Sequence, residues 1–248
     1  MTRTIKLTVQ YDGTEYSGWQ RQLNARTVQE LLETALAKMT GATTHVQGSG
    51  RTDSGVHARA QVATFRTEAT IALAGFQRGL NTALPRDIGI VAIAEVEAGF
   101  DARRAARGKH YCYRIWTAEA REPLLDRFVW HLGRPLDTVA MQAAATHLVG
   151  EHDFTTFRTA DCDRKNPVRS IRRLDVTAGE GGLVTVDAFA TAFLKHMVRI
   201  VVGTLVEVGL GRRGADDLPR ALAARNRSEA GRTAPAKGLT LERVFYET

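Results

Sequence analysis

A glycine-rich stretch, residues 48–61, carries the combination of side chains best suited to chemistry in this chain. Three glycines fall within eight residues, so the backbone there can adopt positive φ and approach another segment or a ligand closely. Asp53 follows Arg51 by two residues in this loop. Small apolar residues then alternate, as on the inner face of a strand, at Val56, Ala58, Ala60 and Val62. The stretch therefore predicts a sheet-anchored loop that presents a carboxylate beside a guanidinium.

Asp53 in this loop admits three interpretations. It could cap its own backbone in an Asp-Ser-Gly turn, which is the ordinary role of an aspartate in such a loop. A phosphate-binding loop is less well supported, because the Gly-Lys-Ser/Thr ending of a P-loop is missing and no helical pattern follows. The third interpretation is a catalytic carboxylate kept ionised by a neighbouring cation, which needs support from elsewhere in the chain.

The composition is that of a globular, basic protein. The chain has 248 residues, 44% of them hydrophobic, enough for a sizeable core in one large domain or two smaller ones. Its 34 Lys and Arg outnumber its 27 Asp and Glu, which favours a polyanionic partner such as nucleic acid, although an ordinary solvated surface has the same signature. The basic residues gather in three groups: Arg103, Arg104, Arg107 and Lys109; Arg158, Arg164, Lys165, Arg169, Arg172 and Arg173; and Arg212 with Arg213. Three such groups favour contact with a phosphate backbone.

Cysteines and apolar runs exclude several classes of protein. Cys112 and Cys162 lie fifty residues apart without a Cys-x-x-Cys or His-x-Glu companion, so neither a zinc site nor a disulfide framework is indicated. No run of about eighteen apolar residues predicts a membrane span, and the N-terminus begins directly with a strand pattern instead of a signal peptide. We therefore expect a cytoplasmic protein with no membrane association.

Hydrophobic periodicity predicts alternating strands and helices in both halves of the chain. In the first half we expect strands over residues 5–11, 56–62 and 88–96, and helices over 28–39 and 73–81. In the second half we expect strands over 109–116, 128–132, 168–177 and 183–190, and helices over 136–149 and 193–208. This order favours a sheet with helices packed on one face.

Three local patterns add detail to these elements. Thr27 followed by Glu30 predicts a capping box at the start of the first helix. Tyr16 and Trp19, in the loop before that helix, could pack against the sheet or contact bases. Arg199 stands alone in the most apolar helix, so it must either reach the surface or meet a carboxylate or phosphate.

Several sequence blocks together carry a resemblance to a known family. They are Tyr11-Asp12-Gly13-Thr14 with Gly18-Trp19-Gln20, Gly50-Arg51-Thr52-Asp53-x-Gly55-Val56-His57-Ala58, Gly79-Leu80-Asn81-x-x-Leu84-Pro85, Tyr111-x-Tyr113-Arg114-Ile115, Phe193-x-x-x-Met197-Val198-Arg199 and Ala236-x-Gly238-Leu239. In this order the chain resembles the TruA family, tRNA pseudouridine synthase I, over nearly its whole length. Two departures are Ser54, where the family usually has Ala, and Ala60, where it usually has Gly.

The resemblance implies an α+β fold and a reaction. The fold would consist of two ferredoxin-like halves, residues 1–105 and 106–248, that form one continuous, mainly antiparallel sheet with helices on one face. The protein would be a homodimer that receives the anticodon arm of tRNA in a cleft between the halves. It would isomerise uridines of the anticodon stem-loop, at positions 38–40 of the family's substrates, to pseudouridine without a metal or an organic cofactor.

The resemblance also assigns a role to Asp53, and from the chemistry we hypothesise roles for four further residues. Asp53 would be the essential carboxylate, acting as a nucleophile at the sugar or the base or as a base that removes a sugar proton; the sequence does not separate these roles. Arg199 would pair with Asp53, and Arg51 would contact RNA phosphate or help to extrude the base. Tyr111 would stack on the uracil and Leu239 would pack on its other side, whereas strand alternation alone would make Tyr111 an ordinary sheet residue.

Two other functions compete with the synthase. A non-catalytic tRNA-binding module or chaperone could share the fold and the basic charge. The joint presence of Asp53, Tyr111 and Arg199 argues against it. An RNA base deaminase is disfavoured because the chain lacks the zinc-ligand motif of that class.

Overall fold

The computed structural model describes residues 1–247 and divides the chain into two compact units. The first unit is Met1–Arg107 together with the C-terminal segment that begins at Leu241, and the second is Gly108–Thr240. The two predicted halves, 1–105 and 106–248, differ from these units at the C-terminus, because the last residues of the chain belong to the first unit.

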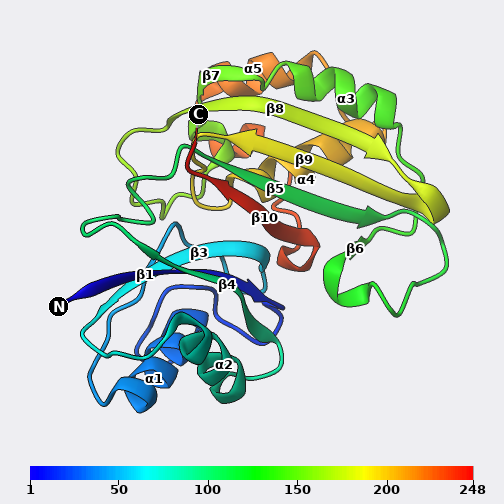
Figure 1. Cartoon of the computed structure of the whole chain (residues 1–248). Coiled ribbons are helices and arrows are strands. Elements are labelled where there is room, and N and C mark those ends of the chain that lie inside the picture. The colour runs from blue at the N-terminus through cyan, green and yellow to red at the C-terminus, as the bar shows by residue number, and fades with distance from the viewer. Residues whose placement is uncertain (248) are drawn as a thin grey trace. The chain divides into compact units, whose positions relative to one another are not determined.

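The first unit has the element order β-α-β-β-α-β. Its elements are β1 (Arg3–Tyr11), α1 (Val28–Thr40), β2 (Gln47–Gly48), β3 (His57–Thr67), α2 (Leu73–Ala83) and β4 (Ile88–Val96). The strand order is β4-β1-β3 with β2 beside β3, and all of these pairs are antiparallel. This is the split arrangement of a ferredoxin-like fold, and α1 and α2 lie together on one face of the strands (Figure 1).

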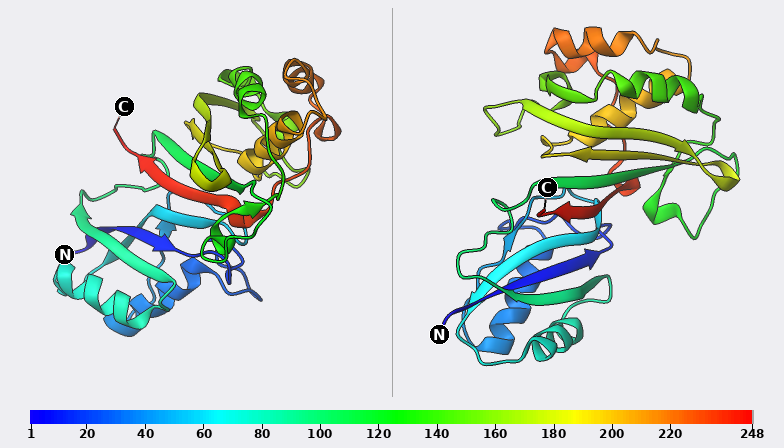
Figure 2. Two further views of the ribbon diagram at one scale, coloured as in Figure 1. Left: turned by 90° about the vertical axis from the view of Figure 1, so that its right-hand side faces the viewer. Right: turned by 45° about the horizontal axis from the view of Figure 1, so that its top comes forward.

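The second unit repeats this arrangement with additions. Its strands and longer helices are β5 (Gly108–Trp116), β6 (Trp130–His131), α3 (Thr138–Thr146), β7 (Gly150–Asp153), β8 (Val168–Ala178), β9 (Leu183–Ala190), α4 (Met197–Gly209), α5 (Asp217–Ala224) and β10 (Leu239–Phe245). Short 3-10 turns are η1 (Asp126–Phe128), η2 (Thr155–Phe157), η3 (Glu180–Gly182), η4 (Arg227–Glu229) and η5 (Ala236–Gly238). The strand order is β5-β9-β8-β7 with β6 beside β5, and α3 packs against both β8 and α4 (Figure 2).

The fold class predicted from the sequence is confirmed. The first unit shows the four-strand order of a ferredoxin-like half, and the pairing within the units is antiparallel except where β6 joins β5. β10 begins at Leu239 in the second unit and ends at Phe245 in the first, so the boundary between the units falls within this strand. None of the helices in residues 1–247 has both the length and the apolar character that crossing a bilayer requires.

Strand β3 differs from its prediction, because it is buried on both faces. Val62 is 6% exposed, as the predicted inner face requires, but Gln61 and Ala63 on the opposite face are fully buried. β3 lies between β1 and β2 in the sheet of the first unit, with α1 and α2 on one face of the strands. The alternation of small apolar residues therefore predicted one buried face of β3 and missed the other.

The capping box predicted at Thr27 is wrong. The Thr27 side chain makes no capping hydrogen bond, and its hydroxyl oxygen is buried without a hydrogen-bond partner. The first N–H groups of α1 donate instead to main-chain carbonyls of the preceding loop, Val28 to Gly18 at 3.2 Å and Gln29 to Trp19 at 3.0 Å. Main-chain carbonyls ten residues earlier in the chain thus cap the N-terminus of α1 in place of the threonine side chain.

The apolar helix of the second unit is shorter than predicted. α4 begins at Met197, and His196 before it has a left-handed backbone with φ of 60°, which ends any helical run from residue 193. α3 and β6 are also shorter than the predicted ranges 136–149 and 128–132. The prediction that this helix is buried around most of its circumference is confirmed, since eleven of its thirteen residues are buried.

Lys109, on β5 opposite Ala190, is a partly buried cation in the sheet of the second unit. Burial lowers the pKa of its ammonium group to about 8. Between about pH 8 and its ordinary value of 10.5, the unfolded chain therefore holds a proton at this residue that the folded chain has lost. The free energy of unfolding then rises with pH across this window.

We expect the variant Lys109→Met to lose this pH dependence. Urea unfolding between pH 7 and 9.5 should show the free energy of unfolding of the wild type gaining about 2 kcal/mol relative to the variant, from about 1.4 kcal/mol per pKa unit. Lys38→Met, at an exposed position on α1, is the matched control and should follow the wild type. Parallel curves for the wild type and Lys109→Met would contradict the burial of a charged lysine.

Candidate active site

The loop that carries Asp53 is a tight turn closed by the main chain. The N–H of Val56 donates to the carbonyl oxygen of Asp53 at 3.1 Å, and Gly55 between them has φ of 76°. This turn needs no carboxylate to close it, so the Asp-Ser-Gly pattern does not oblige the side chain to cap the loop. A strand, β3, follows the loop, which excludes the phosphate-binding loop considered above, because a P-loop leads into a helix.

Aromatic residues of the first strand and the following loop hold this turn in place. The hydroxyl groups of Tyr11 and Thr52 share a hydrogen bond of 2.8 Å, and the carbonyl of Thr52 accepts from the N–H of Trp19 at 3.2 Å. The carbonyl of Tyr16 accepts from the N–H of Gly55 and from the hydroxyl of Ser54, each at 3.2 Å. The residues on both sides of Asp53 are therefore bonded to the segment 11–19.

Gln61 anchors the other end of the loop. It is fully buried, accepts a hydrogen bond from the Ser49 hydroxyl at 2.7 Å and donates to the carbonyl of Gly50 at 3.0 Å. Burial raises the pKa of the Tyr11 phenol, with smaller opposing contributions from hydrogen bonds to Thr52 and Gln61. The buried phenol therefore stays protonated and available as a hydrogen-bond donor at neutral pH.

Two glycines allow the segment 11–19 to approach the loop so closely. A Cβ atom on Gly13 would lie 2.0 Å from the carbonyl oxygen of Val56, and one on Gly18 would lie 2.4 Å from that of Thr52. Both neighbours are main-chain atoms that cannot move aside, and Gly18 also has φ of 85°. Any side chain at either position would displace the Asp53 loop.

His57 also holds the segment 11–19, a role that sequence reasoning missed. Its ring is 2% exposed, and its Nδ1 accepts a hydrogen bond from the N–H of Gly13 at 3.0 Å. Nδ1 also lies 3.1 Å from a carboxylate oxygen of Asp12. Both contacts hold the His57 ring against the segment 11–19. The only signal in the sequence is a polar residue at the start of an apolar strand.

Tyr16 and Trp19 are packing residues in this structure. They are 2% and 1% exposed, and Trp19 lies 6.2 Å from the ring of Tyr11 between ring centres. Of the two roles that the sequence left open, packing against the sheet is the one observed, and contact between these rings and bases is not supported. By contrast, Arg51 is exposed and Asp53 is partly exposed.

The second unit carries the other three predicted site residues, and Arg199 lies in the first turn of α4. Its Nε donates to the carbonyl of Ala234 at 2.8 Å, and its own carbonyl accepts from the N–H of Ala234 at 3.0 Å. The side chain is partly exposed. This double contact fixes the guanidinium near the segment that leads into β10, a segment that no sequence pattern had connected with α4.

Tyr113 lies close to Arg199 and was not predicted as a site residue. Its ring is fully buried, and its hydroxyl donates to the carbonyl of Pro235 at 2.7 Å. Burial raises the pKa of this phenol, while the positive charges of Arg199 and Arg232 act in the opposite direction. Tyr113 and Arg199 therefore bind neighbouring residues of the same segment, 234–235.

Tyr111 and Leu239 are largely buried in the second unit. Tyr111 is 7% exposed, lies opposite Ala188 on β9 and meets Phe193 edge to face with 5.2 Å between ring centres. Leu239, 5% exposed, is the first residue of β10. The tyrosine is thus the sheet residue that its alternation predicted, and its ring is held by an aromatic neighbour from the loop before α4.

The predicted site residues fall in both units. Asp53 and Arg51 belong to the first unit, and Tyr111, Arg199 and Leu239 belong to the second, so the pairing of Asp53 with Arg199 stays a prediction. In the part of the chain that the structure describes, no group of three or more His, Cys, Asp and Glu side chains is arranged to hold a metal ion.

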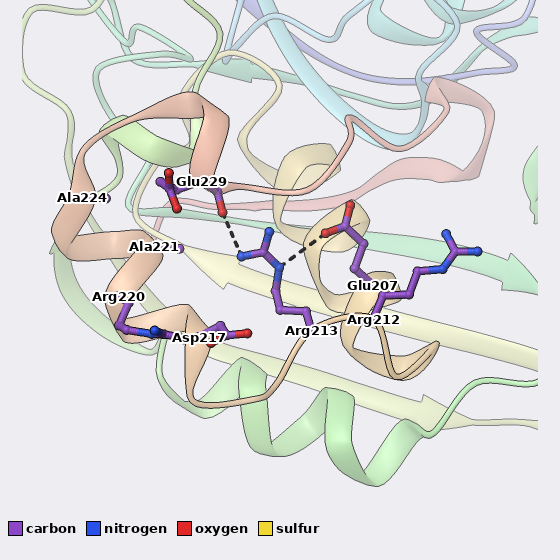
Figure 3. A pocket seen from close by; sticks show the side chains of 8 residues that line it. All are labelled: Glu207, Arg212, Arg213, Asp217, Arg220, Ala221, Ala224 and Glu229. Atoms are coloured by element: carbon purple, nitrogen blue, oxygen red, sulfur yellow. Dashed lines mark hydrogen bonds and ion pairs between the residues drawn. The ribbon is translucent and has the colours of Figure 1, made fainter.

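A pocket of about 550 Å³ in the second unit is separate from these residues (Figure 3). Charged side chains from the end of α4, from α5 and from the loops beside them line it: Glu207, Arg212, Arg213, Asp217, Arg220 and Glu229, with Ala221 and Ala224. Arg213 pairs with Glu207 at 3.3 Å, and Arg220 pairs with Asp217. Three arginines face three acidic residues, so the pocket has no clear preference for a charged ligand.

A family model and several curated proteins that are similar to this chain carry the same description. A model of a family described as tRNA pseudouridine synthase matches residues 7–103 and 144–247. A protein from Myxococcus xanthus named tRNA pseudouridine synthase A is 48% identical over 242 residues, which cover 98% of this chain and 91% of the relative. Proteins of the same name from Geotalea uraniireducens and Citrifermentans bemidjiense are each 47% identical, covering 98% and 99% of this chain and 100% and 98% of the relatives.

The hydrogen bond between Tyr11 and Thr52 predicts a coupled effect on stability. Tyr11→Phe and Thr52→Val should each lower the free energy of unfolding by about 1–2 kcal/mol, because each leaves the other hydroxyl buried without this partner. The double variant should lose less than the sum of the two, with a coupling of about 1 kcal/mol in urea unfolding. Strict additivity would show that the two hydroxyls do not stabilise the loop through each other.

Proposed function

The chain belongs to the tRNA pseudouridine synthase family, and on that premise we propose that it isomerises uridines of the tRNA anticodon stem-loop, at positions 38–40, with Asp53 as the essential carboxylate. The activity is that of an isomerase, with uridine in tRNA as the substrate and pseudouridine as the product. The observation that carries the assignment of Asp53 is its place in a loop bonded on both sides to the segment 11–19.

The chemistry explains why such a loop is needed. Isomerisation breaks the bond between N1 of uracil and C1′ of ribose, turns the base within the site and joins C5 to C1′, with loss of the proton from C5 and gain of a proton at N1. The base must leave its stack before these steps. Asp53 could attack the sugar, attack the base or remove a sugar proton. Each role requires the carboxylate to keep one position while the base moves, which the anchored turn supports.

Arg199 is the cation that we assign to Asp53. The carbonyl of Ala234 holds the guanidinium at Nε, and the planar guanidinium has a donor geometry suited to a carboxylate. Such a pair would keep Asp53 charged in a site closed to water, and water must be kept out because it would hydrolyse the detached sugar. The fixed position of Arg199 in the first turn of α4 supports this role.

The remaining site residues are assigned to the RNA. Arg51 is exposed, which suits contact with a phosphate or insertion beside the extruded base. Tyr111 is assigned to stacking on the uracil and Leu239 to packing on its other face. The edge-to-face contact with Phe193 supports a stacking role, because it fixes the plane of the Tyr111 ring.

The proposal includes the setting in which the protein works. The substrate is the anticodon arm of tRNA, the protein acts as a homodimer in the cytoplasm, and the reaction uses no metal or organic cofactor. These assignments rest on the family resemblance. The excess of Lys and Arg over Asp and Glu, 34 against 27, supports an RNA partner.

We expect Asp53→Asn to bind tRNA with unchanged affinity and to form no pseudouridine. The amide has nearly the same shape as the carboxylate but carries neither its charge nor its nucleophilicity. Release of tritium from tRNA labelled at C5 of uridine measures the reaction directly. Glu97→Gln, an exposed carboxylate in the same unit, is the matched control and should keep wild-type activity. Measurable turnover by Asp53→Asn would remove the catalytic assignment.

The same assay separates the competing functions. A synthase releases tritium from C5, because the new glycosidic bond forms at that carbon. A non-catalytic tRNA-binding module and a base deaminase leave it in place. Binding of tRNA by the wild type without tritium release would therefore favour the binding module over the synthase.

Substitution of Arg199 tests its pairing with Asp53. We expect Arg199→Gln to move the acid limb of the pH–rate profile to higher pH, because the carboxylate would lose its neighbouring positive charge. Arg199→Lys keeps that charge and should show a smaller displacement. An acid limb at the wild-type position in Arg199→Gln would refute the pair.

A further inference from the structure

Two of the basic groups lie in the second unit, and they differ in how their arginines are paired with other groups. In the group Arg212 and Arg213, the second arginine is paired with Glu207 at 3.3 Å and donates to the carbonyl of Glu229 at 2.9 Å. The other group gathers on the loop between η2 and β8, residues 158–167, and at the start of β8. In this second group, the charges of Arg158 and Arg164 act on Arg169.

Three arginines of this group converge on a single loop. Arg158 donates from its guanidinium to the carbonyl of Arg164 at 2.8 Å. Arg169 donates to the carbonyls of Asn166 at 3.0 Å and Val168 at 2.6 Å. Arg158 and Arg169 therefore hold the two ends of the loop that carries Arg164, whose own side chain is half exposed.

The carboxylates near this loop are engaged with other cations. Asp161 pairs with Lys195 at 2.5 Å, and Asp153 pairs with Arg225 at 3.1 Å and interacts more weakly with the charge of Arg158. The carboxylate of Asp163 lies 3.9 Å from Nε of Arg164, beyond hydrogen-bond distance, and the Asp163 side chain is 73% exposed. Solvent screens such an exposed pair, so it offsets little of the positive charge.

The three positive charges act on one another. Burial lowers the pKa of Arg169, and the neighbouring charges of Arg164 and Arg158 lower it further. In addition, Nε of Arg169 is a buried donor without a hydrogen-bond partner. An arrangement that places like charges together, one of them partly buried, costs free energy in the unliganded protein, and a bound anion would remove that cost.

We propose that the loop 158–169 is a binding site for a phosphate group of the RNA backbone, in which Arg158 and Arg164 contact the phosphate and Arg169 holds the loop in position. That the anion belongs to RNA rests on the proposed function. The planar guanidinium matches the oxygens of a phosphate, and contacts of this kind position RNA without reading its sequence. The loop is therefore a positioning surface for tRNA in addition to the site around Asp53.

Arg164→Gln tests this site without disturbing the loop, because the two arginines that close it are unchanged. Binding of tRNA at 0.05 to 0.3 M KCl should show an affinity about 3- to 10-fold weaker than that of the wild type, and a slope of log affinity against log salt reduced by about 0.7–0.9, the value of one phosphate contact. Arg220→Gln is the matched control. It removes an exposed arginine of the same unit that is already paired with Asp217, and should match the wild type in both quantities.

Two outcomes would overturn the proposal. One is an Arg164→Gln variant whose affinity and salt slope equal those of Arg220→Gln. The other is a site for free phosphate only, seen as stabilisation of the wild type by inorganic phosphate that Arg164→Gln lacks, with tRNA affinity unchanged. Pseudouridine formation at saturating tRNA is measured alongside and should be equal in all three proteins. Its absence from the wild type would refute the proposed activity, whereas weaker tRNA binding by Arg164→Gln would still support an RNA site.

Discussion

The close approach of two stretches of main chain is the constraint on which the candidate active site depends. A Cβ atom at Gly13 or Gly18 would lie 2.0 Å and 2.4 Å from carbonyl oxygens of the Asp53 loop. Because no side chain stands between them, Tyr16 and Trp19 can bond to the loop through their backbones while their rings fill the core. Backbone contacts thus set the position of the loop that carries the carboxylate. A moving substrate disturbs such contacts less than it would disturb contacts made by flexible side chains.

The second unit holds its own predicted residues in a comparable way. A Cβ atom on Gly203 of α4 would lie 1.8 Å from the carbonyl oxygen of Arg232, so this helix packs directly on the main chain of the segment that leads to β10. Thr204 accepts a hydrogen bond from the N–H of Gly231 at 2.9 Å, and Arg199 exchanges two with Ala234. Burial against this segment explains the apolar character of α4. Its single arginine, Arg199, lies near the N-terminal end of the helix and contacts Ala234 of the segment.

The local charge of a basic group in this protein depends more on its carboxylate partners than on the number of its arginines and lysines. Arg213 and Arg220 are as basic in the sequence as Arg158 and Arg164, but the fold pairs the first two closely with Glu207 and Asp217, whereas the carboxylate beside Arg164 lies 3.9 Å away and is largely exposed. Burial in the sheet lowers the pKa of Lys109 to about 8, so this residue contributes less positive charge than its sequence implies. A group of basic residues therefore forms an anion-binding site where the tertiary structure places no close, well-shielded carboxylate beside it.

The sequence by itself determined the elements and the motif, because both are local. Alternation and helical spacing predicted most strands and helices, the apolar face of α4 was evident, and the blocks around Asp53, Tyr111 and Arg199 indicated the family. The tertiary structure alone decided which polar groups meet. Thr27 was predicted to cap α1, but the carbonyls of Gly18 and Trp19 do so. The roles of His57 and Gln61 arise from partners that local pattern does not reveal, and in the case of His57 the partner lies 44 residues away. Local periodicity reports which face of an element is buried, whereas a hydrogen bond between distant segments depends on how close their backbones come, and only the folded chain sets that distance.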